Sequence, residues 1–297
     1  MPDDYLEDGG QLKGPVKPLK KKHKVLAGLF RVLCVAIFAV GVASVANFLY
    51  LRINFGDSFF VNGLSMYPTL NKNGSRLENG SYRPLRWNDG GNKIDDIIDY
   101  GWGRTDEGKG WRNDLKRYDL VITYYPSDYK NEAKTELYST ASLKIKRLIG
   151  LPGETVTITS DPSYPGNSVW AKTTISQKDG TTFNLPNLYT EADFPDIVLD
   201  SGATIRYTSY PFPSGTFNTW TLGEDEYFVM GDNRRGNFSG DSRSPSTGPI
   251  KANMLTGKAY ILTGMAKVQS TENGDIDAKP LFSHMKMPWS YIDLTRK

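Results

Sequence analysis

The chain has 297 residues, which allows one large or two modest domains. With 38% hydrophobic and 12% aromatic residues, and with 29 Gly and 17 Pro, the composition excludes a collagen, a coiled coil and a wholly disordered chain and favours β structure. The formal net charge of +3 is too small to indicate a nucleic-acid partner.

An uncharged run of twenty residues, Val32 to Leu51, lies between Arg31 and Arg52. As a helix it would be about 30 Å long, the thickness of a bilayer's hydrocarbon core, so the run predicts a transmembrane helix over 32–51. The tail at 1–31 is basic, with five lysines between residues 17 and 24. This asymmetry predicts a single-pass protein of the cell membrane with a cytoplasmic N-terminus and an extracytoplasmic domain after Leu51.

Two other interpretations of this run are open. Ser44, Val45 and Ala46 form a small-x-small exit of the kind at which a signal peptide is cut. The run could also be a buried core helix, although no polar face interrupts it. Its length exceeds the usual apolar region of a signal peptide, about 7 to 15 residues, so we expect a membrane anchor.

The remainder of the chain contains short strand-like runs separated by Gly, Pro, Asn or Asp. We expect a mostly β fold: a catalytic β core over 52–159 and 223–297, with an insertion at 71–114 and an inserted second β lobe over 160–222. The strands are expected at 59–61, 120–125, 143–148, 154–159, 204–207, 227–230 and 258–262.

The first segment with chemical potential is Asn62-Gly63-Leu64-Ser65-Met66-Tyr67-Pro68-Thr69. Gly63 leaves room for an approaching peptide, and Pro68 restrains the path that follows Ser65. Such a serine can expose its hydroxyl beside an unpaired backbone N–H, as a nucleophile and its oxyanion donor require. Alone, such a segment is more often a turn without catalysis.

The second segment is Lys144-Ile145-Lys146-Arg147, followed by Leu-Ile-Gly-Leu-Pro-Gly. In a strand Lys144 and Lys146 share a face, so one of them could turn inward, where loss of solvation would lower its pKa toward neutrality. A neutral amine could then take the serine's proton. The alternative is that both lysines lie on the solvated face of a strand and have no catalytic role. Of the two histidines, His23 precedes the apolar run, and His284 has no neighbouring Asp to orient it.

The third segment runs from an apolar strand, 227–230, into a polar loop that ends in Ser239-Gly240-Asp241-Ser242-Arg243. Such a loop could supply a hydroxyl that orients a buried amine, and Asp241 with Arg243 is a candidate ion pair that would hold the loop in place. The alternative is a hydrophilic turn without a chemical role.

Together, in this order after a membrane anchor, these segments resemble the bacterial type I signal peptidases, which are Ser/Lys-dyad serine endopeptidases. Residues 59–70, 117–123, 146–153 and 227–243 correspond to the family's boxes. The resemblance implies that Ser65 is the nucleophile, Lys146 the general base, Ser239 the hydroxyl that orients the lysine, and Asp241 and Arg243 a structural pair. It also implies signal peptides of exported preproteins as substrates, and no cofactor or metal.

The sequence departs from the family pattern in three places. Gly63 replaces a serine that assists the oxyanion in some members, so the Ser65 backbone N–H would carry that role. The segment between Asp232 and Ser239 is about two residues longer than the pattern, and 71–114 is unusually long.

Two other functions remain as alternatives to a general signal peptidase. One is a related Ser/Lys peptidase for a dedicated substrate, such as a pilin-processing enzyme or a self-cleaving repressor. The other is a membrane-tethered β-rich binding protein without catalysis.

Overall fold

The structure is a computed structural model that describes residues 21–61, 63, 65–71, 97–104, 111–160, 171–186, 188–189, 197–198, 204–205, 218–234, 239–270, 276–281 and 285–295. The chain forms two compact units, Met1–Tyr50 and Leu51–Lys297. The first twenty residues of the expected basic tail, much of the expected second lobe and His284 lie outside the described residues.

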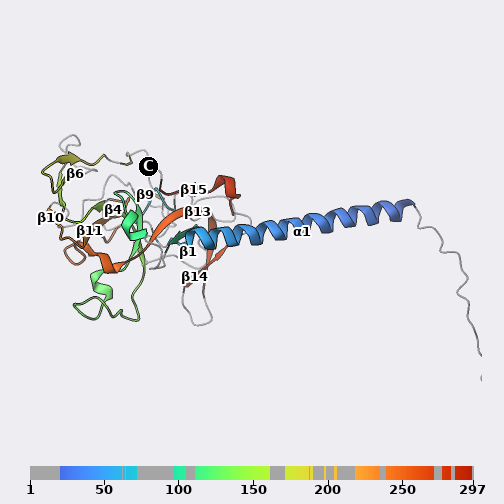
Figure 1. Ribbon diagram of the computed structural model, residues 1–297, viewed down its shortest axis with the longest axis horizontal. Coiled ribbons are helices and arrows are strands. Elements are labelled where there is room, and N and C mark those ends of the chain that lie inside the picture. The colour runs from blue at the N-terminus through green and yellow to red at the C-terminus, as the bar shows by residue number, and fades with distance from the viewer. Residues whose placement is uncertain are drawn as a thin grey trace, which may run out of the picture. The chain divides into compact units, whose positions relative to one another are not determined.

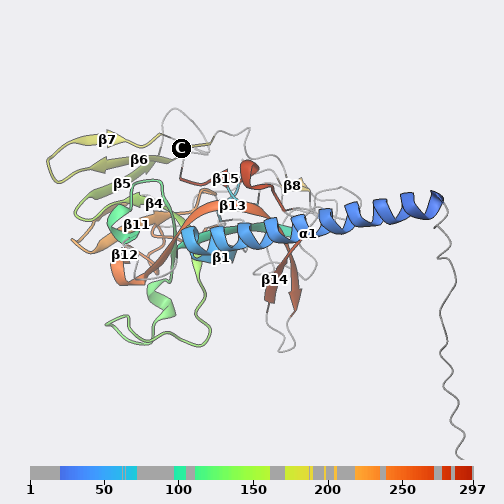
Figure 2. The ribbon, with the colours of Figure 1, turned by 45° about the vertical axis from the view of Figure 1, so that its right-hand side comes forward.

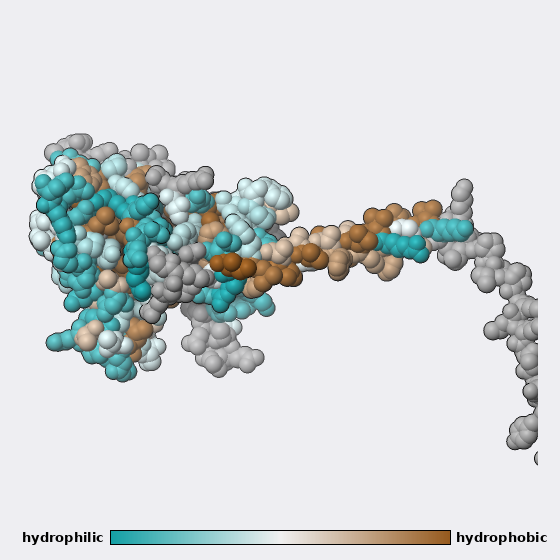
Figure 3. All heavy atoms as spheres, in the orientation of Figure 1, coloured by the Kyte–Doolittle hydropathy of each residue, from teal (hydrophilic) through white to brown (hydrophobic). Residues whose placement is uncertain are grey.

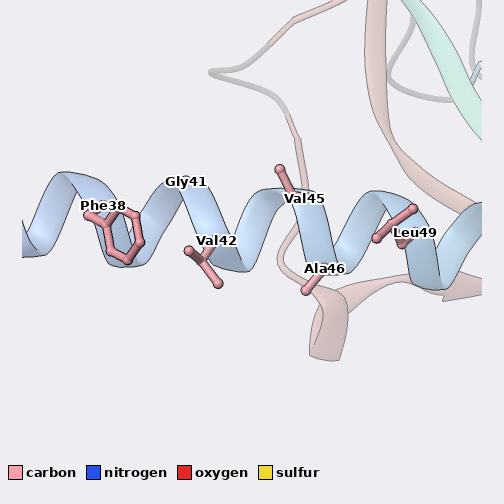
Figure 4. A pocket seen from close by; sticks show the side chains of 6 residues that line it. All are labelled: Phe38, Gly41, Val42, Val45, Ala46 and Leu49. Carbon is pink, nitrogen blue, oxygen red and sulfur yellow. The ribbon is translucent and has the colours of Figure 1, made fainter.

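Helix α1 (Lys21–Phe55) contains the apolar run and extends it at both ends. Apolar side chains are exposed along most of its length, as the brown surface of the helix in Figure 3 shows. Six of these residues line a shallow hollow on one face: Phe38, Gly41, Val42, Val45, Ala46 and Leu49 (Figure 4). Within the part of the chain that the structure describes, α1 alone is long and apolar enough to cross a membrane.

The second unit is built on one large sheet (Figures 1 and 2). Its order is β1 (Asp57–Phe60), β2 (Ile97–Arg104), β13 (Leu255–Ser270), β3 (Leu120–Thr123), β4 (Lys144–Gly150), β11 (Glu226–Met230) and β12 (Ile250–Lys251). Two further strands, β14 (Ile276–Pro280) and β15 (Ile292–Asp293), pair with β13. Every pairing is antiparallel. Short 3₁₀ helices lie at Trp111–Asp114, Pro126–Asp128, Ala252–Met254 and Pro288–Ser290.

Apolar side chains bury both faces of this sheet in several clusters. One cluster joins Met66 and Leu70, from the segment that carries Ser65, to the sheet residues Leu120 and Leu262. The four side chains of β3 are all buried, and so are the last five residues of β4. The site segments therefore rest on buried strands, which favours a fixed geometry.

A second sheet has the order β10 (Thr219–Thr221), β5 (Thr155–Ser160), β6 (Ala171–Ser176) and β7 (Thr182–Asn184), and three of its strands lie side by side in Figure 2. Strand β5 was expected in the catalytic core, yet it pairs with β6 and β10. Strands β8 (Ile197–Val198) and β9 (Thr204–Ile205) form a separate pair.

The stretch expected as an insertion at 71–114 contains β2, a strand of the main sheet. Along its whole length β2 pairs with β13, and on its other side it pairs with β1. A Cβ at Gly101 would lie 2.4 Å from the Ile261 carbonyl oxygen, so this close approach of two backbones requires glycine. Residues 97–104 are thus part of the core. The overall expectation of a mostly β protein after one N-terminal apolar helix is confirmed.

Candidate active site

The loop that carries Ser65 lies between β1 and β2. Gly63 has a φ of +81°, a conformation that glycine adopts without strain, and a Cβ at this position would meet nothing within 4 Å. Met66 and Leu70 are fully buried, whereas Ser65 is partly exposed. Burial of these two side chains anchors the loop on either side of the partly exposed Ser65.

The side chain of Lys146 contacts Ser65. Its Nζ atom lies 2.8 Å from Ser65 Oγ and 3.0 Å from the carbonyl oxygen of Ile145. The side chain comes from β4, where Lys146 is opposite Val121 of β3, and it is only 4% exposed. Burial is the main cause that lowers the pKa of Lys146 to about 8, because it penalises the charged amine.

Lys144, the other candidate base, has a different partner. Its Nζ atom donates to both carboxylate oxygens of Asp128, at 2.7 and 2.5 Å, and lies 5.1 Å from the centre of the Tyr125 ring. The structure therefore places Lys146, and not Lys144, against Ser65.

The backbone around Ser65 is held from the other side by the segment that follows β11. The N–H of Asn233 donates to the Ser65 carbonyl oxygen at 3.1 Å. Gly231 is in close contact with the same carbonyl: a Cβ there would lie 2.4 Å from Ser65 O and 2.2 Å from Ser239 Oγ. Only glycine fits between the two serines. Among the described residues, no hydrogen bond uses the Ser65 N–H.

Asp241 is the centre of a buried network. Arg243 donates to both carboxylate oxygens, at 2.8 and 2.9 Å, and the Gly231 N–H and the Ser239 hydroxyl donate at 2.9 and 2.7 Å. Burial alone would raise the pKa of Asp241, but the Arg243 charge and these hydrogen bonds outweigh it and lower the pKa. Ser239 thus lies beside Gly231 and donates to Asp241, and its role toward Lys146 stays a prediction.

A second buried ion pair, between Arg147 and Asp232, was not anticipated from the sequence. The Nε and Nη2 atoms of Arg147 each lie 2.6 Å from an Asp232 oxygen, and neither side chain is more than 1% exposed. Thr69, from the Ser65 loop, donates to Asp232 and accepts from Arg147 at 3.2 Å. Arg147 and Asp232 both lie in segments that resemble the family's boxes, and this was the only sign in the sequence that they could matter. Their pairing across 85 positions was not visible.

Asn71 and Asp99 form a second unanticipated contact, at the base of the Ser65 loop. The Asn71 N–H donates to Asp99 Oδ2 at 2.6 Å, and the Asp99 N–H donates to Asn71 Oδ1 at 2.8 Å. Among the described residues, no group of three or more His, Cys, Asp or Glu side chains could hold a metal ion.

The comparison with protein families identifies the class of protein as a peptidase. The family model described as "Signal peptidase, peptidase S26" matches residues 29–263, more than half of the chain. The chain belongs to this signal peptidase family, whose members remove signal peptides from preproteins. The resemblance seen in the sequence is therefore confirmed.

Among solved structures, the chain is similar to a signal peptidase I from Enterococcus faecalis V583. The identity is 26%, the match covers 48% of this chain and 95% of the other, and the TM-score is 0.27. No curated protein sequence matches the chain.

Proposed function

We propose that the chain is a membrane-anchored serine endopeptidase that removes signal peptides by means of a Ser/Lys dyad, with Ser65 as nucleophile and Lys146 as general base. The observation that carries the proposal is the 2.8 Å contact between Lys146 Nζ and Ser65 Oγ at a lysine that is 4% exposed. A hydroxyl within hydrogen-bond reach of an amine with a lowered pKa is the arrangement that nucleophilic catalysis by serine requires.

The reaction begins when neutral Lys146 accepts the Ser65 proton and Ser65 Oγ attacks the scissile carbonyl. Lys146 then gives the proton to the departing amine as the C–N bond breaks, and an ester to Ser65 remains. A water molecule that loses a proton to Lys146 attacks this ester. Lys146 returns that proton to Ser65 Oγ as the ester C–O bond breaks, and the acyl group leaves as a carboxylic acid. Water is the only co-reactant, so the cycle needs neither a cofactor nor a metal.

The Ser65 N–H is the proposed oxyanion donor. It lies beside the nucleophile and makes no hydrogen bond to another described residue. Gly63 carries no side chain that could add a second donor, and the open space at its Cβ position leaves room for the substrate backbone. Asp241 and Arg243 hold the loop of Ser239, which in this proposal orients Lys146.

Topology supplies the remaining selectivity. We assign α1 as the anchor in the lipid bilayer, with the basic tail on the cytoplasmic side and the unit after Leu51 on the extracytoplasmic side. The substrate would then be the signal peptide of a preprotein at the membrane face, bound as an added strand with small residues near the cut. We keep the expected division into a core over 52–159 and 223–297 and a second lobe over 160–222 with one change: β5 (Thr155–Ser160) moves from the core to the lobe.

The test is cleavage of several unrelated preproteins by the purified full chain in detergent. We expect Ser65→Ala and Lys146→Ala each to lower kcat/KM by at least about 1,000-fold, because either change removes a group that acts in the transition state. Lys144→Ala is the matched control on the same strand and should retain most of the activity. Activity in Ser65→Ala would exclude the proposal, and cleavage of one preprotein alone would indicate a dedicated peptidase.

A further inference from the structure

The Ser65 loop is fastened at its base by one side chain, that of Asn71. Asn71 Nδ2 donates to the carbonyl oxygens of Val61 and Gly63, at 3.0 and 2.9 Å. Asn71 also exchanges two hydrogen bonds with Asp99 of β2, and the Val61 N–H donates to the Asp99 carbonyl oxygen at 3.1 Å. Both ends of the loop are therefore tied to each other and to the sheet.

Few residue types could replace Asn71. Its φ is +61°, in the left-handed region that glycine, asparagine and aspartate tolerate best. Glycine would suit the backbone but would make none of the side-chain bonds. Aspartate would place a carboxylate against two carbonyl oxygens, because it has no N–H to donate. Since Asn71 is 2% exposed, water cannot readily replace the lost partners.

The hydrogen bonds of Asn71 matter because Ser65 and Lys146 belong to different elements of the fold. The Ser65 loop follows β1 and is bonded through Asn71 to Asp99 of β2, whereas Lys146 belongs to β4. In the sheet, β13 and β3 lie between β2 and β4, so no direct pairing sets the distance between the two side chains. The loop must therefore hold Ser65 Oγ at the correct distance from Lys146 Nζ, and a shift of about 1 Å can lower a rate about 100-fold.

We propose that Asn71, together with Asp99, is a positioning residue that holds the Ser65 hydroxyl in reach of Lys146. This inference rests on the proposed dyad and adds to it a residue outside the recognised segments. Asn71 touches neither Ser65 Oγ nor Lys146 Nζ in the structure, so it acts through the loop backbone. Its loss should lower the turnover number while substrate binding along the sheet stays intact.

The experiment measures kcat and KM of the full chain with a preprotein for Asn71→Gly and Asn71→Asp. Both variants keep a residue that tolerates the backbone conformation, and both lose the two bonds to Val61 and Gly63. We expect kcat to fall roughly 10- to 100-fold and KM to change less than about threefold. The pH of half-maximal rate should remain that of the wild type, because the burial of Lys146 is unchanged.

The matched control is Asn131→Gly. Asn131 also brackets a short loop, through bonds to Thr135 and Glu136, but these partners lie within its own exposed loop. It should keep wild-type kcat. If Asn71 variants do not fold, Asp99→Ala removes the acceptor for the Asn71 N–H while Asn71 keeps its side chain, and it should lower kcat about three- to tenfold.

Wild-type kcat in Asn71→Gly, or in Asp99→Ala where that variant is used, would overturn the inference. A loss of kcat/KM that comes only from a higher KM, with kcat unchanged, would also overturn it. Ser65→Ala, measured in parallel, separates this result from failure of the dyad: an inactive Ser65→Ala beside a fully active Asn71→Gly rejects the positioning role alone.

Discussion

Two segments meet at Ser65, and they are held by different forces. The segment after β11, described at 231–234 and 239–243, is fixed by the buried ion pairs Arg147–Asp232 and Arg243–Asp241. The Ser65 loop, 61–71, is fixed at its base by Asn71, an uncharged side chain. Buried charges are strongly destabilising when one partner is lost, whereas neutral hydrogen bonds contribute less each. Loss of an ion-pair partner in the first segment should therefore act mainly on folding, and loss of Asn71 in the second mainly on catalytic geometry.

The largest expected effect comes from Asp232→Ala. The change leaves the Arg147 guanidinium buried without its carboxylate, so we expect the free energy of unfolding to fall by about 3 to 5 kcal/mol. Denaturant unfolding measures this loss. Glu136→Ala is the control, because the Lys130–Glu136 pair is exposed and should contribute less than about 1 kcal/mol. A larger loss for Asn71→Gly than for Asp232→Ala would contradict the comparison.

Gly231→Ala tests the contact between the two segments. A Cβ at Gly231 would lie 2.4 Å from the Ser65 carbonyl oxygen, so the serine backbone or the 231 segment must move. We expect kcat to fall about 100-fold. Gly240→Ala is the matched control in the same segment, since a Cβ there meets nothing within 4 Å. Equal activity of the two variants would show that the contact does not determine the position of Ser65.

Lys146→Met should stabilise the fold while it abolishes activity. At pH 7 the amine is charged in both the folded and the unfolded chain, and its burial opposes folding. As the pH rises from about 8 to 10.5 the folded state loses this proton first, so the wild type gains stability relative to the variant. At pH 7 the free energy of unfolding of the variant should exceed that of the wild type by up to roughly 3 kcal/mol. This difference should vanish above pH 10.5. A variant less stable at pH 7 would contradict the burial of a charged amine.

The smallest effect is expected for Lys144→Met. The positive charge of Lys144 is among the causes that lower the pKa of Lys146, after burial. Its removal should move the pH of half-maximal rate upward and leave the rate at high pH nearly unchanged. The exposed Lys130→Met should move neither. A downward movement would show that Lys144 acts on the dyad in another way.

The sequence predicted the parts of this protein that depend on local patterns. The apolar run predicted α1, and turn residues between apolar runs predicted β1, β3, β4, β5, β11 and part of β13. Strand β2 was missed because Gly101 and Gly103 weaken a strand pattern, while the structure requires glycine there for close contact with β13.

Contacts between distant positions were the part that could not be predicted. Residues 65, 146, 241 and 243 were singled out because they belong to recognisable segments. The pairing of Arg147 with Asp232 and the clamp formed by Asn71 and Asp99 depend on which strands become neighbours, and the residues alone do not reveal that. At Asn71 the residue type is the only local signal in the sequence, because asparagine tolerates the left-handed backbone that the structure shows there.

The most direct test of the central claim, a buried amine that acts as the base for Ser65, is the pH dependence of kcat/KM. With the pKa of Lys146 at about 8, the rate should rise about tenfold per pH unit below pH 8 and reach a plateau above it. A rate that is constant between pH 6 and 9, or that rises only toward pH 10.5, would contradict the claim.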